Sequence, residues 1–162
     1  MVARPLRIAV EMRRGFHARL GAGALVLVAC VAFGESFADD PTLHELAARG
    51  DPARIALLIN RGEPVDVRDA AGRTPLHVAA ERAHLFAAMM LLAKGADPNA
   101  RDAEKQTPLH LAAGGDSSTD GERMQIVKVL IAKGSDRAAR DAHGKRPVDY
   151  ATRAEIRQVL EP

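Results

Sequence analysis

The sequence is poor in aromatic residues and in cysteine. Only 3% of its 162 residues are Phe, Trp or Tyr, and Trp is absent, although 47% of the residues are hydrophobic. A core with so few aromatics must be built from Ala, Leu, Ile, Val and Met, which favours small, closely packed helices over a β-sandwich. Cys30 is the only cysteine, so the chain cannot form an internal disulfide.

The body of the chain carries no excess of either charge. The formal net charge is +2, but residues 1–38 hold five Arg against two acidic residues. Residues 39–162 hold 18 basic and 19 acidic side chains. The basic balance therefore belongs to the N-terminus, and the body gives no electrostatic reason to expect a nucleic acid as partner.

The longest apolar run is too short to span a membrane comfortably. It comprises the 14 residues Leu20–Phe33, whereas a spanning helix needs roughly 20. Arg-rich sequence precedes the run, and Ser36-Phe37-Ala38 follows it with the small residues that signal peptidase accepts. We interpret residues 1–38 as a signal peptide that is removed to leave Asp39 first. This export signal, rich in Ala and Arg, predicts a location in the periplasm of a Gram-negative bacterium.

Two features leave alternatives open within this segment. Leu27–Cys30 resembles a lipobox, which would anchor the protein as a lipoprotein through Cys30, although the residues after Cys30 stay apolar. Arg13-Arg14-Gly15-Phe16 resembles the core of a twin-arginine signal, so the choice between Sec and twin-arginine export stays open. Met12 is an alternative start, because residues 12–38 alone form a signal of ordinary length.

The rest of the chain is an internal repeat. Thr74-Pro75-Leu76-His77 recurs 33 residues later as Thr107-Pro108-Leu109-His110. Three glycines (62, 95 and 134) and three aspartates (69, 102 and 141) are spaced by 33 and then 39 residues, so six residues are inserted in one place. These motifs resemble the ankyrin repeat over residues 40–162. The resemblance implies an all-α ankyrin-repeat solenoid of four helix–turn–helix units joined by finger loops.

The units of this predicted domain, residues 39–162, follow from the spacing. They span about 40–69, 70–102, 103–141 with the six-residue insertion, and 142–162 as a C-terminal cap. In the last unit Arg146 replaces the Thr of the motif and Asp149 replaces the His. Terminal units of a solenoid are expected to depart in this way, because one of their faces meets water.

The local sequence explains each helix. Thr74 is a good N-cap, and Pro75 occupies the first helical position, where the missing N–H costs nothing. Leu76 and the alanines after it form the buried stripe of a short first helix. A second helix is expected over residues 85–94, with Leu85, Met89 and Leu92 at helical spacing and Gly95 ending it.

A row of histidines raises the question of a metal site. His44, His77 and His110 hold the same position in successive units. Packed helices lie roughly 8–10 Å apart, whereas zinc ligands must lie within about 2.1 Å of the metal, so the row cannot share one zinc. The family resemblance implies instead that this His bonds the Thr hydroxyl and nearby backbone and braces the finger.

We expect the protein to be non-enzymatic and to use no cofactor, because none of the serine-hydrolase, zincin or phosphate-loop motifs occurs. The insertion contains half of a calcium-loop pattern in Asp116, Ser118 and Asp120, followed by Gly121. Val127 stands where such a loop needs a bidentate Glu, so a solvated loop that enlarges the binding face is the preferred interpretation of residues 114–121.

The resemblance implies a monomeric module that binds a protein through its finger tips and inner helices. Two other functions stay open, an immunity-type inhibitor of an exported toxin or enzyme and a calcium- or redox-linked accessory protein. No membrane contact is expected unless Cys30 is lipidated. The candidate partner-binding residues are Arg73, Glu81, Arg82, Arg101, Glu104, Lys105, Gln106, Arg140, His143 and Lys145.

Overall fold

The computed structural model describes residues 41–115 and 120–161, and all the regular structure in these ranges is helical. The helices are α3 (Leu43–Arg49), α4 (Pro52–Asn60), α5 (Pro75–Glu81), α6 (Leu85–Ala93), α7 (Pro108–Gly114), α8 (Asp120–Ala132), α9 (Pro147–Tyr150) and α10 (Ala154–Leu160). The predicted signal peptide lies outside the described residues.

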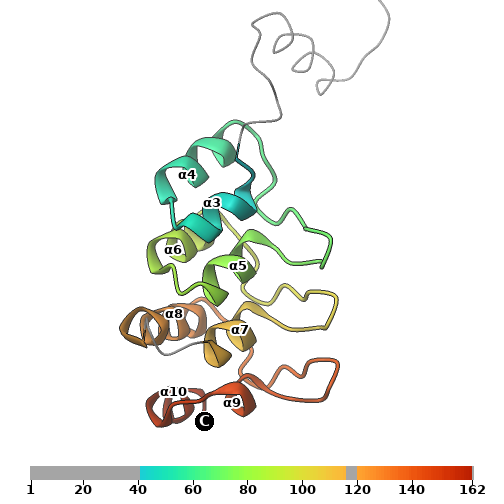
Figure 1. Ribbon diagram of the computed structural model, residues 1–162, viewed down its shortest axis with the longest axis vertical. Helices are drawn as coiled ribbons and strands as arrows, with labels where there is room; N and C mark the ends of the chain where they lie inside the picture. Colours follow the sequence, from blue (N-terminus) through green and yellow to red (C-terminus); the bar gives the residue numbers. More distant parts are fainter. Residues whose placement is uncertain (1–40, 116–119, 162) are drawn as a thin grey trace, which may run out of the picture. The chain divides into compact units, whose positions relative to one another are not determined.

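The helices form four antiparallel pairs stacked along one axis (Figure 1). The shorter first helices α3, α5, α7 and α9 make an inner row, and α4, α6, α8 and α10 make an outer row. Each helix packs against its partner and against its neighbours in the same row. The loops between units project to one side of the stack as fingers. The predicted all-α solenoid of four helix–turn–helix units is confirmed.

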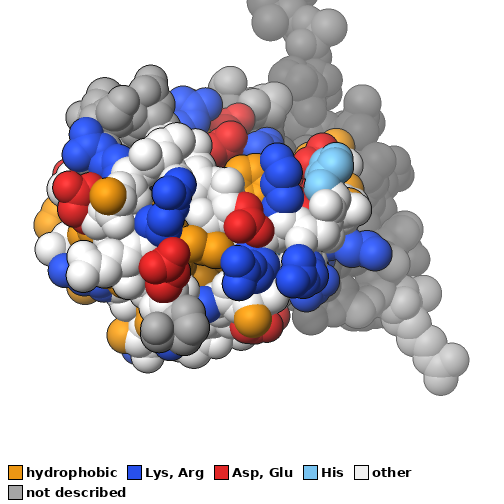
Figure 2. All heavy atoms as spheres, turned by 90° about the horizontal axis from the view of Figure 1, so that it is seen from below, with side chains coloured by type: hydrophobic (Ala, Val, Ile, Leu, Met, Phe, Trp, Pro, Cys, Tyr) orange, Lys and Arg blue, Asp and Glu red, His pale blue; other side chains and the backbone are white. Residues whose placement is uncertain are grey.

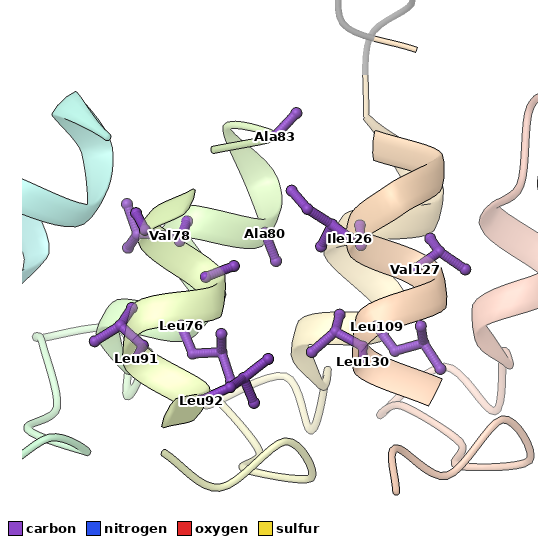
Figure 3. Packing of buried hydrophobic residues seen from close by; sticks show 14 of the residues in the cluster. Leu76, Val78, Ala80, Ala83, Leu91, Leu92, Leu109, Ile126, Val127 and Leu130 are labelled. Carbon is purple, nitrogen blue, oxygen red and sulfur yellow. The ribbon is translucent and has the colours of Figure 1, made fainter. Parts of the chain in front are cut away.

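The core lies between the two rows and is aliphatic. Leu76, Leu91 and Leu109 are fully buried, and so are the alanines that face them across neighbouring inner helices. Figure 3 shows the leucines of α5 and α6 lying next to the aliphatic side chains of α7 and α8. Alanine has no bulk beyond its β-carbon, so the helices can approach closely and still exclude water.

The three residues at helical spacing in the second helix of unit two are buried to different extents. Leu92 is buried, Leu85 is partly buried and Met89 is 46% exposed. Ala87, Ala88 and Leu91 face the core together with Leu92. Every residue of α6 is apolar, so the hydrophobic pattern has no polar side that would reveal its orientation.

The fingers are held to one another by backbone hydrogen bonds. Within each finger an Asp N–H donates to the carbonyl four residues later, as from Asp69 to Arg73 at 3.0 Å. Between fingers, the Ala103 N–H donates to the Ala71 carbonyl at 3.0 Å, and the Ala142 N–H donates to the Glu104 carbonyl at 2.8 Å. The tips therefore project from a connected framework.

Candidate functional site

The Thr and His of the repeated motif fix each inner helix to the next finger. The backbone N–H of Thr74 donates to His77 Nδ1 at 3.1 Å, and the Thr74 hydroxyl lies 2.9 Å from the same nitrogen. Because Nδ1 accepts, the ring proton sits on Nε2, which donates to the Gln106 carbonyl at 3.1 Å. Thr107 and His110 repeat this arrangement, with the Lys145 carbonyl as acceptor. The bracing role inferred from the family resemblance is confirmed.

Burial keeps these two imidazoles neutral. Desolvation is the largest cause that lowers the pKa of His77 and of His110 below the ordinary value of 6.5. The carbonyls that accept from Nε2 act in the opposite direction, but they do not reverse the shift. A neutral ring is what the bracing geometry requires, since Nδ1 must accept a hydrogen bond.

At the cap, Asp149 takes over the role of the histidine. Its Oδ2 accepts the backbone N–H of Arg146 at 2.7 Å, which closes the start of α9. That hydrogen bond is the largest cause of the lowered pKa of Asp149. The last unit therefore keeps the cap of the inner helix after losing both Thr and His.

One aspartate closes each finger hairpin. Asp69 Oδ1 accepts the backbone N–H groups of Ala71 and Arg73, both at 2.9 Å. Asp102 and Asp141 make the same pair of bonds in the next two fingers. Hydrogen bonds to the backbone of the turns occupy these carboxylates. Other side chains of the finger tips are therefore the ones available to contact a partner.

Most of the predicted partner-binding residues lie on one surface. We call it the finger face and define it as residues 68–73, 101–106 and 140–145 of the fingers, with the C-terminal ends of α5 and α7. The predicted residues that are exposed there are Glu81, Arg82, Arg101, Glu104, Lys105, Arg140, His143 and Lys145.

Two predicted partner-binding residues are half-buried instead of exposed. Arg73 Nε lies 3.0 Å from Asp69 Oδ2, and Nη1 of the same side chain lies 3.3 Å from Glu81 Oε2. Gln106 donates from Nε2 to the Tyr150 hydroxyl at 3.2 Å. Both side chains therefore support the framework of the finger face.

Tyr150 is a residue that the sequence reasoning missed. Its hydroxyl donates to Asp141 Oδ2 at 2.5 Å, and its ring stacks edge-on against His110 with centroids 5.9 Å apart. The Lys145 ammonium lies 5.3 Å from the ring centroid. Its position in the repeat could have indicated it, because the sole Tyr of the chain follows Asp149 in the last unit as Val78 follows His77 in unit two. Tyrosine is enriched among the residues that dominate protein interfaces.

Arg123 was missed as well, and it lies beside the insertion. Only 3% of it is exposed, and its guanidinium donates to the carbonyls of Leu111, Ala112 and Glu81 at 3.1–3.3 Å. A β-carbon on Gly115 would collide with this guanidinium. The near flank of the predicted solvated loop is therefore packed against the stack.

The calcium-loop pattern falls partly outside the described residues, since 116–119 are not described. Asp120 is the first residue of α8, and Gly121 lies within that helix. The residue expected to turn the loop is thus helical. In residues 41–115 and 120–161, no three His, Cys, Asp or Glu side chains are grouped as a metal site. Within the same ranges, no helix is long and apolar enough to cross a membrane.

Stacked helix pairs, braced fingers and one exposed finger face define a helical repeat module. The family model for ankyrin repeats (3 copies) matches residues 43–120 and 88–161. The chain therefore belongs to the ankyrin-repeat family. Ankyrin repeats generally mediate protein–protein interaction and are typically non-enzymatic.

Short segments are similar to curated proteins of several kinds. Acyl-CoA-binding domain-containing protein 1 of Arabidopsis thaliana is 44% identical over 43 residues, 26% of this chain and 13% of that protein. Ankyrin repeat and SOCS box protein 14 of Homo sapiens is 42% identical over 45 residues, 28% of this chain and 8% of that protein. Because the chain covers so little of each relative, these matches indicate repeat units and carry no whole-protein activity.

Proposed function

We propose that this protein is a non-enzymatic, monomeric module that binds a protein partner through the finger face. The observation that supports the proposal most directly is that some finger residues hold the turns together while others are exposed. The turns use the carboxylates of Asp69, Asp102 and Asp141, whereas Glu104, Lys105 and their neighbours are exposed beside them. A rigid surface that presents Arg is well suited to protein recognition, because Arg is enriched among the residues that dominate interfaces and a rigid surface loses little entropy on binding.

The proposal includes export. The basic, apolar and small-residue regions of residues 1–38 support removal of this segment and a location in the periplasm. The chain then meets its partner outside the cytoplasm. An immunity-type inhibitor would use the same finger face, with an exported toxin or enzyme as the partner.

A triple variant tests the finger face. Arg82, Glu104 and Lys105 are exposed, so replacing all three with Ala should change the stability by no more than about 0.5 kcal/mol per site. The same change should weaken capture of a partner selected by the wild type from a displayed library of proteins and peptides. Arg61, Glu63 and Lys128 are exposed outside the finger face, and replacing them with Ala gives a control of equal charge change.

The result that supports the proposal is loss of capture in the finger variant with both variants folded by circular dichroism. If the finger variant binds as well as the control variant, the finger face is not the binding surface.

A further inference from the structure

One arginine occupies the same position in three successive fingers. Arg68, Arg101 and Arg140 each come directly before the aspartate that closes the hairpin, and all three are exposed. Arg68 Nη1 donates to the Gly72 carbonyl at 2.7 Å and to the Arg101 carbonyl at 2.6 Å. Arg101 Nη1 donates to the Arg140 carbonyl at 3.3 Å, and Arg140 Nη1 donates to the Gly144 carbonyl at 2.6 Å. We call these three residues the arginine row.

Hydrogen bonds tie the arginine row to the backbone of the fingers. Each side chain uses Nη1 to bond backbone carbonyls, which ties the guanidinium to the surface with its position fixed. One guanidinium belongs to each unit, so neighbouring groups are separated by about one repeat, roughly 8–10 Å. Figure 2 views the C-terminal end of the stack and shows Lys and Arg side chains over both the helices and the fingers, interspersed with acidic side chains.

The arginine row forms no ion pair within the described part of the molecule, although the charge of Arg140 helps to lower the pKa of Asp149. No carboxylate there lies within 4.0 Å of Arg68, Arg101 or Arg140, whereas Arg73 and Arg146 both have acidic partners. Lys105 and Lys145 extend the positive surface across the finger tips. The finger face is therefore locally basic, although residues 39–162 as a whole are close to neutral.

From this arrangement we infer that the arginine row binds an acidic protein segment in the polyproline II conformation, with a carboxylate at every third residue. The polyproline II helix has three residues per turn and rises about 3.1 Å per residue. Side chains three residues apart therefore lie on one side, about 9 Å apart, which matches one guanidinium per unit. A guanidinium fork binds a carboxylate by two parallel hydrogen bonds, and a thin extended chain can reach groups that are bound to the surface.

This inference rests on the proposed function and specifies its partner. The test uses fluorescence anisotropy with a labelled peptide of sequence EPPEPPEPP and the domain at low salt. The matched peptide PPEPEPEPP has the same composition and charge but places its glutamates on different sides of the helix. We expect the first peptide to bind about tenfold more tightly, and we expect its affinity to fall as salt is raised.

The protein variants separate the row from general charge. Arg68→Gln, Arg101→Gln and Arg140→Gln together should weaken binding of EPPEPPEPP about tenfold. Arg61→Gln, Lys128→Gln and Lys133→Gln remove the same charge from exposed positions elsewhere and should leave binding within about twofold. Replacing the row with Lys keeps the charge, loses the fork and should give an intermediate affinity.

Equal weakening by the two triple variants would overturn the inference, and so would equal binding of the two peptides or no binding of either. A selection from a random peptide library then separates the two proposals. Neutral or basic peptides whose binding is lost in the Arg82, Glu104 and Lys105 variant would refute the acidic partner and keep the finger face as the binding surface. Failure to select any peptide through the finger face would count against both.

Discussion

At the scale of single residues, one short hydrogen bond sets the electrostatics of the last finger. The Tyr150 hydroxyl donates to Asp141 Oδ2, and this bond is the largest cause that lowers the pKa of Asp141 to about 2. The same bond is the largest cause that raises the pKa of Tyr150. The ionised carboxylate is thus the form that closes the hairpin and orients the tyrosine ring beside Lys145.

Replacing Tyr150 with Phe should raise the pKa of Asp141. The ring contacts with His110 and Lys145 are kept while the hydroxyl is lost. A carboxyl group whose pKa is lower in the folded state than in the unfolded state stabilises the fold at pH values above its unfolded pKa of about 3.9. That contribution is lost as the pH falls toward 2. NMR titration of the Asp141 carboxyl carbon measures the shift directly, and an unchanged pKa in Y150F would show that the tyrosine is not its cause.

Lys105 carries the second unusual feature at this scale. Its φ angle is +60°, in the left-handed region, whereas the equivalent finger positions are Gly72 and Gly144 with φ of +73° and +75°. A side chain in this region costs roughly 1–2 kcal/mol. A lysine retained at the tip of the middle finger fits a residue that contacts a partner, since strained residues cluster at functional sites.

Lys105→Gly should stabilise the fold by up to about 1 kcal/mol, because glycine adopts this angle freely but loses more entropy on folding. Urea unfolding measures the difference. Gly144→Lys is the matched control, because a β-carbon there would meet nothing within 4 Å, and it should destabilise by about 1 kcal/mol. A destabilised K105G would mean that other contacts of Lys105 outweigh its backbone strain.

At the scale of helices, a side chain at or near the start of the second helix joins successive units. His84 precedes α6, and its Nε2 donates to the Ala48 carbonyl of α3 at 2.9 Å. Arg123 lies within the first turn of α8, 39 residues after His84. Its guanidinium donates to the carbonyl of Glu81, which holds the position in α5 that Ala48 holds in α3. In both cases a side chain satisfies a carbonyl at the C-terminal end of an inner helix, where the helix itself provides no partner.

Arg123→Met should destabilise the domain by about 2–4 kcal/mol, because buried carbonyls at the ends of α5 and α7 lose charged donors. Thermal or urea unfolding gives the value, with Arg61→Met as an exposed control expected to stay within about 0.5 kcal/mol. A loss no larger than that of the control would show that water replaces the guanidinium without cost.

At the scale of the whole molecule, the stack is stabilised by a continuous aliphatic core in which each unit contacts only its neighbours. A central residue supports two interfaces at once, whereas a residue on the outer surface supports none. Such a chain unfolds cooperatively only while coupling between neighbouring units is strong.

Leu76→Ala should cost about 2–5 kcal/mol, because the side chain is fully buried in the middle of the stack. Leu57→Ala is the matched control, since Leu57 is 49% exposed, and it should cost far less. Urea melts measure both. A loss below about 0.5 kcal/mol for L76A would contradict its place in the core.

Export is the remaining prediction at this scale. Expression in a Gram-negative host should yield a protein in the periplasmic fraction whose sequence starts at Asp39, as measured by N-terminal sequencing and intact mass. A membrane-bound protein that begins with a lipidated Cys30 would support the lipobox alternative, and an uncleaved chain in the cytoplasm would contradict export.

The sequence alone was enough to predict the repeat architecture of this protein. The repeated Thr-Pro-Leu-His motif predicts the start of a helix from local interactions alone. The N-cap, the proline at the first helical position and the histidine acceptor all act within one turn. The 33-residue spacing predicts that the units stack, and the stacking in turn predicts that the finger tips are exposed. Helix starts depend on residues that are neighbours in the chain, and stacking depends on the length of the repeat. Both can be read from one sequence.

Only the tertiary structure decided which side chains meet across units. Arg123 and Glu81 are 42 residues apart, and nothing local indicates that one reaches the other. The wholly apolar α6 could be oriented only by the helices that pack on it. Met89 is therefore exposed although it stands at helical spacing with the buried Leu92. Arg73 and Gln106 look like free surface residues in the sequence. They are half-buried because their partners, Glu81 and Tyr150, are brought to them by the fold.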